Sequence, residues 1–286
     1  MLAQRTNAMP DNVQPVANAG LRKVIEFLDV DYGAEYLDYL DKALAIDTAD
    51  RNWCLAAAAA KHLANAMSYD DPIRVADAKT RADRMQRVTS EVGAPEDAIV
   101  QITEYLHPRM EEVCDCLPKG MADWIERRPK LYAWLDRRVN KGRRVRTNTI
   151  KGYALLWLTA SLRPYRRRLK RHHHEMKSLD VWYQRALDVA AQDYDLGVEV
   201  LNCRRLIKGY SDTHSRGTSK FDRVMSSLEL IQGRADASQW LRRLIEAALQ
   251  DENGDALDGA LKTIASFAEP PGNAAELVAA QTLERN

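Results

Sequence analysis

The chain has 286 residues, of which 45% are hydrophobic and 29% charged, and its formal net charge is +1. These values are typical of an ordinary soluble globular protein with a substantial core, and a charge this close to zero indicates no class of partner by itself. The four cysteines show no CxxC or CxxCxxC spacing, which argues against an iron–sulfur cluster or a structural zinc site. They are Cys54, Cys114, Cys116 and Cys203.

No signal for secretion or membrane insertion is visible. The first twenty residues lack the apolar core of a signal peptide, and the longest apolar run, Tyr153 to Leu162, is about half as long as a membrane span. Sparse cysteine use suits a reducing compartment. We therefore expect a cytoplasmic protein that binds no membrane.

Helical periodicity begins after a short tail. Residues 1–20 are rich in Asn, Gln, Ala and Pro without a period, and they are predicted to form a flexible tail. Apolar spacings of three and four predict a helix at 34–44. A candidate cap at Asp50 and an alanine run of high helix propensity predict a second helix at 51–68. Asp71-Pro72 predicts an N-cap followed by proline at the first position of a helix that ends at Gly93.

Prolines at 108, 118 and 129 predict short helices joined at angles. No segment alternates apolar and polar residues for long enough to predict a strand, so the fold class is all-α. Further helices are predicted at 220–232, 236–250 and 255–267. We expect a single helical domain over residues 21–268 and a C-terminal tail over 269–286.

The longest predicted element runs from about residue 164 to 208. Its apolar residues keep a three/four spacing, and an unbroken helix of this length would extend about 65 Å. So long an apolar stripe needs a partner surface. The pattern predicts a helical hairpin or bundle, with a homo-oligomer through this helix as a further expectation.

Basic residues are concentrated in one segment. Between Arg137 and His174 there is no Asp or Glu, and arginine dominates lysine, which favours bidentate recognition of phosphate or carboxylate. One interpretation is a solvated surface with weak ion pairs; the other is a binding surface for an anionic partner. The candidate residues in this segment are Arg143, Arg144, Arg146, Arg166 and Arg167.

The sequence KGYSDTHSRGT, from Lys208 to Thr218, is a dense polar run. Gly209 is a candidate C-terminal cap, and the Ser, Asp and Thr residues are good caps or turn formers, so a structural corner explains most of it. The alternatives are an anion or partner contact and, less favoured, proton transfer. The candidate contacts are Lys208, Tyr210, His214 and Arg216.

Motifs for familiar chemistry are missing from the sequence. It has no GxGxxG, Walker loop, GxSxG or HExxH pattern, and no catalytic residues are assigned. In the run from His172 to Glu175, adjacent side chains on a helix point about 100° apart, so the histidines cannot converge on one metal ion. No helix-turn-helix, zinc-finger or RNA-recognition signature accompanies the basic segment, which disfavours nucleic acid.

Four stretches resemble a known family in the same order. They are VADAKTRADRMQRVTSEVG, YLHPRMEEVCDCLP, GRRVRTNTIKGY…LRPYRRRL and RLIKGYSDTHSRGTSKFDRVM. Together they resemble the helical C-terminal region, a domain of unknown function, of the indolepyruvate ferredoxin oxidoreductase beta-subunit family. The resemblance covers roughly Leu21 to Phe267.

The resemblance implies a role in oxidative decarboxylation of aryl 2-oxoacids to acyl-CoA. The chain has neither a thiamine-binding GDG…NN motif nor cluster cysteines. Thiamine diphosphate and iron–sulfur clusters are therefore expected on a partner subunit, and no cofactor on this chain. The expected function is an accessory or docking subunit, or a separated domain, without catalysis of its own.

The expected partners are a thiamine-dependent large subunit, with ferredoxin and the phosphates of coenzyme A as further candidates. The alternative is a stand-alone helical protein that binds a small anion through the basic 137–174 segment and the 208–217 loop.

Overall fold

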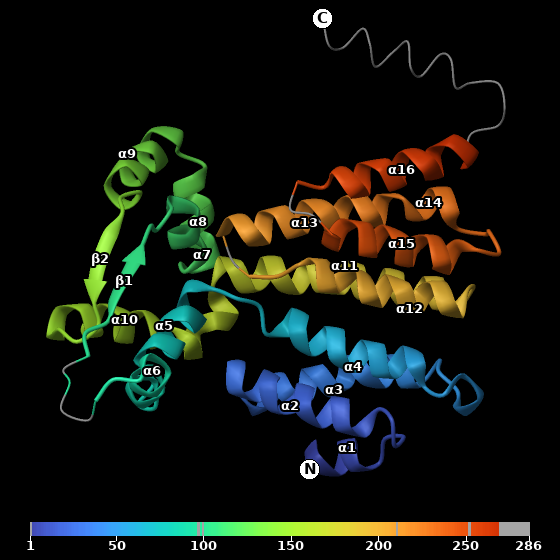
Figure 1. Cartoon of the computed structure of the whole chain (residues 1–286), viewed down its shortest axis with the longest axis horizontal. Helices are drawn as coiled ribbons and strands as arrows, with labels where there is room; N and C mark the ends of the chain where they lie inside the picture. The colour runs from blue at the N-terminus through green and yellow to red at the C-terminus, as the bar shows by residue number, and fades with distance from the viewer. Residues whose placement is uncertain (1, 96–97, 99, 210, 251–252, 269–286) are drawn as a thin grey trace, which may run out of the picture. The chain divides into compact units, whose positions relative to one another are not determined.

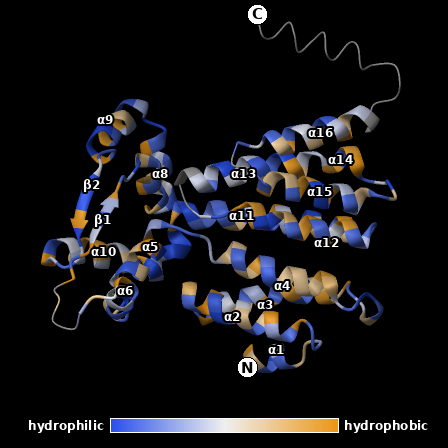
Figure 2. Cartoon of the chain, viewed as in Figure 1, coloured by the Kyte–Doolittle hydropathy of each residue, from blue (hydrophilic) through white to orange (hydrophobic). Residues whose placement is uncertain are grey.

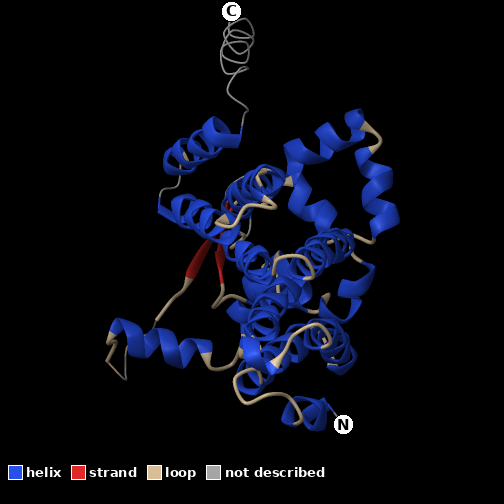
Figure 3. Cartoon of the chain, turned by 90° about the vertical axis from the view of Figure 1, so that its right-hand side faces the viewer, coloured by secondary structure: helices blue, strands red, loops and turns tan. Residues whose placement is uncertain are grey.

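The computed structural model describes residues 2–95, 98, 100–209, 211–250 and 253–268. Helices dominate these residues, which confirms the all-α class (Figures 1 and 3). The strands among them are two short segments, β1 (Thr103–Leu106) and β2 (Arg143–Arg146), which sequence alternation failed to reveal. The expected C-terminal tail, 269–286, lies outside the described residues.

Backbone contacts divide the chain into two compact units, where a single domain over 21–268 was expected. Unit 1 comprises Met1–Gly20, Leu37–Asn65 and the chain from Val181 onward, and unit 2 comprises Leu21–Tyr36 and Ala66–Asp180. Helices α2 (Gln14–Phe27), α3 (Val30–Leu44), α4 (Cys54–Met67) and α11 (Lys170–Ala190) contribute residues to both.

Unit 1 is a helical assembly in which α12 packs on α15 and α15 on α16. The alanine-rich first half of α4 is coloured in the hydrophobic range in Figure 2, and Leu55, Ala59 and Leu63 are fully buried. The remaining elements of this unit are α1 (Leu2–Asn7), η1 (Ala49–Arg51), α12 (Tyr194–Asn202), η3 (Cys203–Leu206), α13 (Ser211–Ser226), α14 (Leu228–Ile231), α15 (Ala237–Gln250) and α16 (Asp255–Ala268).

Unit 2 combines short helices with the two strands. A buried cluster of Met110, Cys114, Ala122 and Ile125 joins α7 (Met110–Asp115) to α8 (Lys119–Glu126), and partly buried side chains of α9 (Pro129–Val139) pack against it. Helix α10 (Ile150–Ala160) packs along α5 (Pro72–Thr80). The remaining elements of this unit are α6 (Arg84–Val92) and η2 (Arg163–Arg168).

Local sequence sets several of these boundaries as predicted. Asp71 caps α5 by accepting a hydrogen bond from the Arg74 backbone N–H at 2.7 Å, with Pro72 at the first helical position. Gly93 ends α6 with a φ of 62°. The single helix predicted from Pro72 to Gly93 is wrong, however, because Arg81 adopts extended backbone and separates α5 from α6.

The unbroken helix predicted over about 164–208 is also wrong. Leu169 is extended and bridges Pro118, which separates η2 from α11. After Ala190 the chain breaks again, and the Asp193 side chain caps α12 by accepting from the Leu196 N–H at 3.0 Å. A Cβ at Gly197 would lie 2.4 Å from the Ala190 Cβ, so this glycine permits a close approach. These breaks remove the basis for an oligomer seam along one helix.

Two segments expected to be irregular are helical. Residues 2–7 and 14–20 belong to α1 and α2 rather than to a flexible tail, and Val13 and Ala17 are fully buried. The polar run after Gly209 was predicted as a loop, but α13 begins at Ser211. Gly209 adopts left-handed backbone, with φ 68°, but it is not the cap that was predicted, because the preceding helix η3 ends at Leu206 with Ile207 as its C-cap. In the described part of the chain, no helix has the length and apolarity to cross a membrane.

Candidate functional site

Arg166 is a structural residue rather than a free binding residue. Its guanidinium donates to both carboxylate oxygens of Asp71, with Nε–Oδ2 at 2.9 Å and Nη2–Oδ1 at 2.8 Å, and to the Phe27 carbonyl at 2.6 Å. It also lies 3.8 Å from the Phe27 ring centroid. Arginine and aspartate are both buried, so this ion pair is part of the unit 2 core.

Arg167, the next residue, has carboxylate partners at the surface. It donates to Glu35 at 2.6 Å and approaches Asp29 at 3.5 Å, and its guanidinium lies 5.3 Å from the Tyr32 ring. These contacts occupy Arg167 within unit 2. The structure therefore assigns Arg166 and Arg167 to internal contacts, not to an open anion site.

The remaining three candidate arginines of the basic segment, Arg143, Arg144 and Arg146, lie on β2. This strand pairs antiparallel with β1, so that Thr103 lies opposite Arg146 and Tyr105 opposite Arg144. Side chains on a strand alternate between faces, so Arg144 and Arg146 share a face with Tyr105. Arg143 belongs to the opposite face, next to Leu106.

The face with Arg144 and Arg146 forms one wall of a groove of about 610 Å³. The first turn of α10 supplies the other wall, with Thr149 capping that helix by accepting from the Gly152 N–H at 3.2 Å. Glycine at 152 allows close packing, because a Cβ there would lie 2.0 Å from the Arg146 carbonyl oxygen. The lining residues are Thr103, Tyr105, Arg144, Val145, Arg146, Thr149, Lys151, Gly152 and Leu155. We call this hollow the hairpin groove.

The hairpin groove presents positive charge that no described carboxylate pairs with. Arg144, Arg146 and Lys151 are exposed, and no ion pair is seen for them among the described residues. Arg144 lies 5.6 Å from the ring centroid of Tyr105, itself largely exposed, which holds the guanidinium near the groove. Three cations beside helix N–H groups are suited to a phosphate or carboxylate.

The acidic side chain of the hairpin lies on the face opposite the groove, which leaves the groove face positively charged. Glu104 points to that face and forms ion pairs with Lys79 and Arg84. Burial raises the pKa of the Glu104 carboxyl, but the hydrogen bonds from these two cations outweigh burial and leave the pKa below its usual value. The Glu104 carboxylate is thus paired with Lys79 and Arg84 on the far side of the hairpin, and it does not offset the positive charge of the groove.

The candidates from the polar run lie in unit 1 instead. Lys208 and Arg216 are exposed and His214 is half-buried, while Tyr210 lies outside the described residues. His214 and Arg216 are two residues apart on α13, a spacing that directs side chains to different sides of a helix. The local geometry therefore does not converge these two side chains on one ligand.

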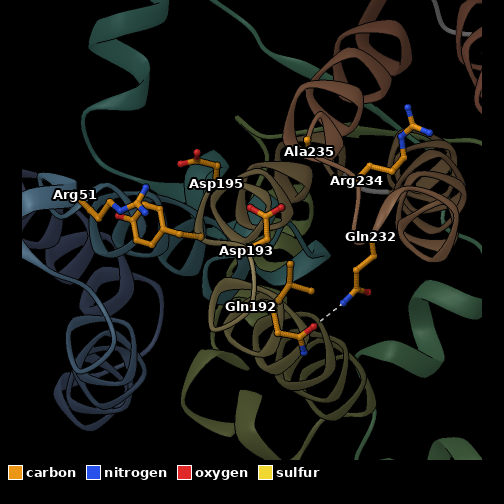
Figure 4. A pocket seen from close by; sticks show the side chains of 10 residues that line it. Arg51, Gln192, Asp193, Asp195, Gln232, Arg234 and Ala235 are labelled. Atoms are coloured by element: carbon orange, nitrogen blue, oxygen red, sulfur yellow. Dashed lines mark hydrogen bonds between the residues drawn. The ribbon is translucent and has the colours of Figure 1, made fainter.

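A second cleft, of about 620 Å³, lies in unit 1 (Figure 4). It was not predicted from the sequence. Three separate segments form it: Arg51 at the end of η1, the stretch 192–195 that leads into the first turn of α12, and the turn 232–235 before α15. Gln232 donates to the Gln192 side-chain oxygen at 3.1 Å across it. Only Asp193, as a helix cap, was recognisable from local sequence.

Most polar groups of this second cleft already have structural roles. Asp193 caps α12, and the Arg51 guanidinium lies 5.0 Å from the Tyr194 ring. The Tyr194 hydroxyl donates to Asp47 at 2.8 Å, and burial together with that carboxylate raises its pKa to about 12. A phenol held this firmly protonated is a poor general base, so we assign the cleft no chemistry.

Two buried histidines are kept neutral. Burial, with Arg167, His173 and Arg166 adding to it, lowers the pKa of His172 to about 4, and its Nδ1 lies 3.2 Å from the Tyr69 hydroxyl. In unit 1, burial lowers the pKa of His62 to about 4 against the opposing hydrogen bond with Asn202. Across the described residues, no three His, Cys, Asp or Glu side chains are grouped to hold a metal ion.

Comparison with protein-family models identifies a family for this chain. A model of a family of unknown function (DUF6537) matches residues 13–227, about three quarters of the chain. No curated protein and no solved structure matches.

Proposed function

Because the chain belongs to this family of unknown function, DUF6537, we propose a role from its chemistry and its sequence resemblance. The proposed role is a cytoplasmic docking module of an indolepyruvate-type 2-oxoacid:ferredoxin oxidoreductase. In this role a thiamine-dependent large subunit carries thiamine diphosphate, the iron–sulfur clusters and the decarboxylation chemistry. The support for this partner is the resemblance of four ordered sequence stretches, which fall mostly within the matched region.

The observation that carries a binding role is the hairpin groove. Arg144, Arg146 and Lys151 line it without described carboxylate partners, whereas Arg166 and Arg167 of the same basic segment have such partners. Exposed cations collected in one groove attract an anionic surface and accelerate encounter. An acidic patch on the large subunit, a surface of ferredoxin and the phosphates of coenzyme A all present the required charge.

Co-purification tests this proposal. The full chain is expected to retain the thiamine-dependent large subunit at low salt, and the complex should weaken as salt screens the groove. The Arg144→Glu, Arg146→Glu double variant should lower the affinity at least tenfold, since it reverses two charges in the groove. A matched double reversal of exposed cations elsewhere in unit 2, Arg87→Glu with Lys177→Glu, should lower it far less. Absence of the complex at low salt for the unaltered chain contradicts the proposal.

A second candidate function, a stand-alone anion-binding protein, is favoured by the same groove and needs no partner subunit. It keeps the hairpin part of the basic 137–174 segment from the sequence expectation and omits the 208–217 loop. Inorganic pyrophosphate should then raise the melting temperature of the isolated chain, and Arg144→Glu with Arg146→Glu should abolish that rise. A pyrophosphate effect equal in the two proteins removes this candidate.

A further inference from the structure

Helix α10 exposes apolar side chains where a surface helix normally exposes polar ones. Ile150 is 90% exposed, Leu158 60% and Trp157 54%, and Tyr153 and Leu155 are also exposed. We call these five residues the α10 outer face. Its buried counterparts are Gly152 and Leu156, which lie on the side where α10 packs within unit 2.

The arrangement departs from the usual pattern of an amphipathic helix, because apolar residues lie on the exposed side of α10 as well as on its buried side. At 100° per residue, positions 150, 153, 154, 157 and 158 fall on one side, and every one of them is apolar or aromatic. A hollow of about 480 Å³ lies along this side, lined by Ile150, Tyr153, Ala154, Trp157 and the preceding residues 147–149. Contiguous exposed apolar surface of this kind marks an interaction site.

Charge borders the α10 outer face on one flank. Leu155 lines both the outer face and the hairpin groove, so Lys151, Arg144 and Arg146 lie along that edge. The hollow along Ile150, Tyr153 and Trp157 has no charged residue in its lining. An occupant must therefore be apolar in its centre and acidic along one edge.

This charge distribution discriminates between occupants. A second copy packed on the same face with the two α10 helices antiparallel would bring Arg144, Arg146 and Lys151 close to the same cations, and like charges oppose such pairing. A lipid surface would meet cations on one flank only, whereas interfacial helices carry their basic residues along the polar face. A protein helix accommodates the asymmetry, since an apolar stripe at i, i+3, i+4 and i+7 leaves one edge available for carboxylates.

We propose that the α10 outer face binds an amphipathic helix of a partner protein, with an apolar stripe bordered by Asp and Glu. The stripe packs on Ile150, Tyr153 and Trp157, and the carboxylates meet the cations of the hairpin groove. This inference rests on the proposed docking function, and it adds which kind of surface the partner presents to this chain. The α10 helix has eleven residues, about 16 Å, which matches roughly three turns of a partner helix.

Selection of peptides from a random library tests the chemistry of the occupant, whichever protein supplies it. Sixteen-residue peptides are selected on the full chain and counter-selected on a Tyr153→Ser, Trp157→Ser variant whose fold is verified by circular dichroism. The recovered peptides should combine an apolar stripe with Asp or Glu. Their affinity should fall at least tenfold on the counter-selection variant and on Arg144→Glu with Arg146→Glu. It should stay unchanged on Val181→Ser with Leu230→Ser, which alters two exposed apolar residues of unit 1.

Several results would overturn the inference. Peptides without acidic residues, or peptides that bind the Tyr153→Ser, Trp157→Ser variant equally well, would contradict it. So would a chain that dimerises in solution through these two residues, or that floats with phosphatidylglycerol vesicles in a manner dependent on Trp157.

The same variants separate this inference from the proposed function. If the large subunit binds the Tyr153→Ser, Trp157→Ser variant normally but is lost on Arg144→Glu with Arg146→Glu, the helix-docking inference fails alone. If acidic amphipathic peptides are recovered but the large subunit never binds, the oxidoreductase assignment fails alone.

Discussion

Truncation of Arg166 should destabilise unit 2 far more than truncation of Arg167, although the two residues are adjacent in the sequence. Arg166→Ala leaves the buried Asp71 carboxylate without its two guanidinium hydrogen bonds, which measure 2.9 and 2.8 Å. It also removes a hydrogen bond to the Phe27 carbonyl and the contact with the Phe27 ring.

The magnitude follows from the burial of both partners. Breaking a buried ion pair from one side costs about 3–5 kcal/mol, because an uncompensated charge remains in the core. At about 2–4 °C per kcal/mol for a chain of this size, the melting temperature should fall by roughly 10 °C. Arg167→Ala removes surface pairs with Glu35 and Asp29, for which about 0–1 kcal/mol is expected, and a contact with the Tyr32 ring.

Thermal and urea denaturation of the three proteins, followed by circular dichroism, measures this difference. Replacing both charges, with Arg166→Met and Asp71→Asn together, should recover at least half of the lost stability. The uncompensated carboxylate is then gone, and asparagine still caps α5. Equal losses for Arg166→Ala and Arg167→Ala, or no recovery in the double variant, would refute the reasoning.

Two further predictions concern acid stability and glycine packing. The free energy of unfolding should fall as the pH drops from about 6.5 toward 4, because His172 and His62 stay neutral when folded, with pKa values of about 4, but gain protons when unfolded. His172→Gln with His62→Gln should flatten the dependence of the urea midpoint over this range, and an unaltered slope would contradict the assignment. Gly217→Ala should destabilise unit 1 by about 1–3 kcal/mol, since its Cβ would lie 2.6 Å from the Leu206 carbonyl oxygen. Gly259→Ala, with open space around the Cβ on α16, should instead stabilise by about 0.5–1 kcal/mol, and the same sign for both would count against this packing.

The hairpin groove shows how far sequence reasoning reaches toward a binding site. Segregated charge pointed to Arg144 and Arg146, and the structure places both on one face. It pointed equally to Arg166, whose carboxylate partner, Asp71, is 95 residues away in the chain. Strand pairing also escaped notice, because four residues per strand are too few for a period of two to stand out.

The sequence by itself determined the all-α class and several helix ends. These depend on interactions within a few residues, such as the cap of Asp71 on Arg74 and the left-handed glycine at 93. Local periodicity also located apolar faces, but it continued through Leu169 and Asp193, where the chain breaks. Such breaks depend on contacts that periodicity does not report. At Leu169 the contact is the bridge to Pro118, and near Asp193 it is the close approach of Gly197 to Ala190.

Only the tertiary structure decided which side chains are available for binding. Arg166 and Arg146 have the same local chemistry, yet one is enclosed with Asp71 and Phe27 and the other lines an open groove. The apolar run that contains Trp157 is as hydrophobic as a core helix, yet its outer side is exposed. The physical reason is that burial and pairing come from residues distant in the chain, whereas a sequence pattern reports only which residues share a face.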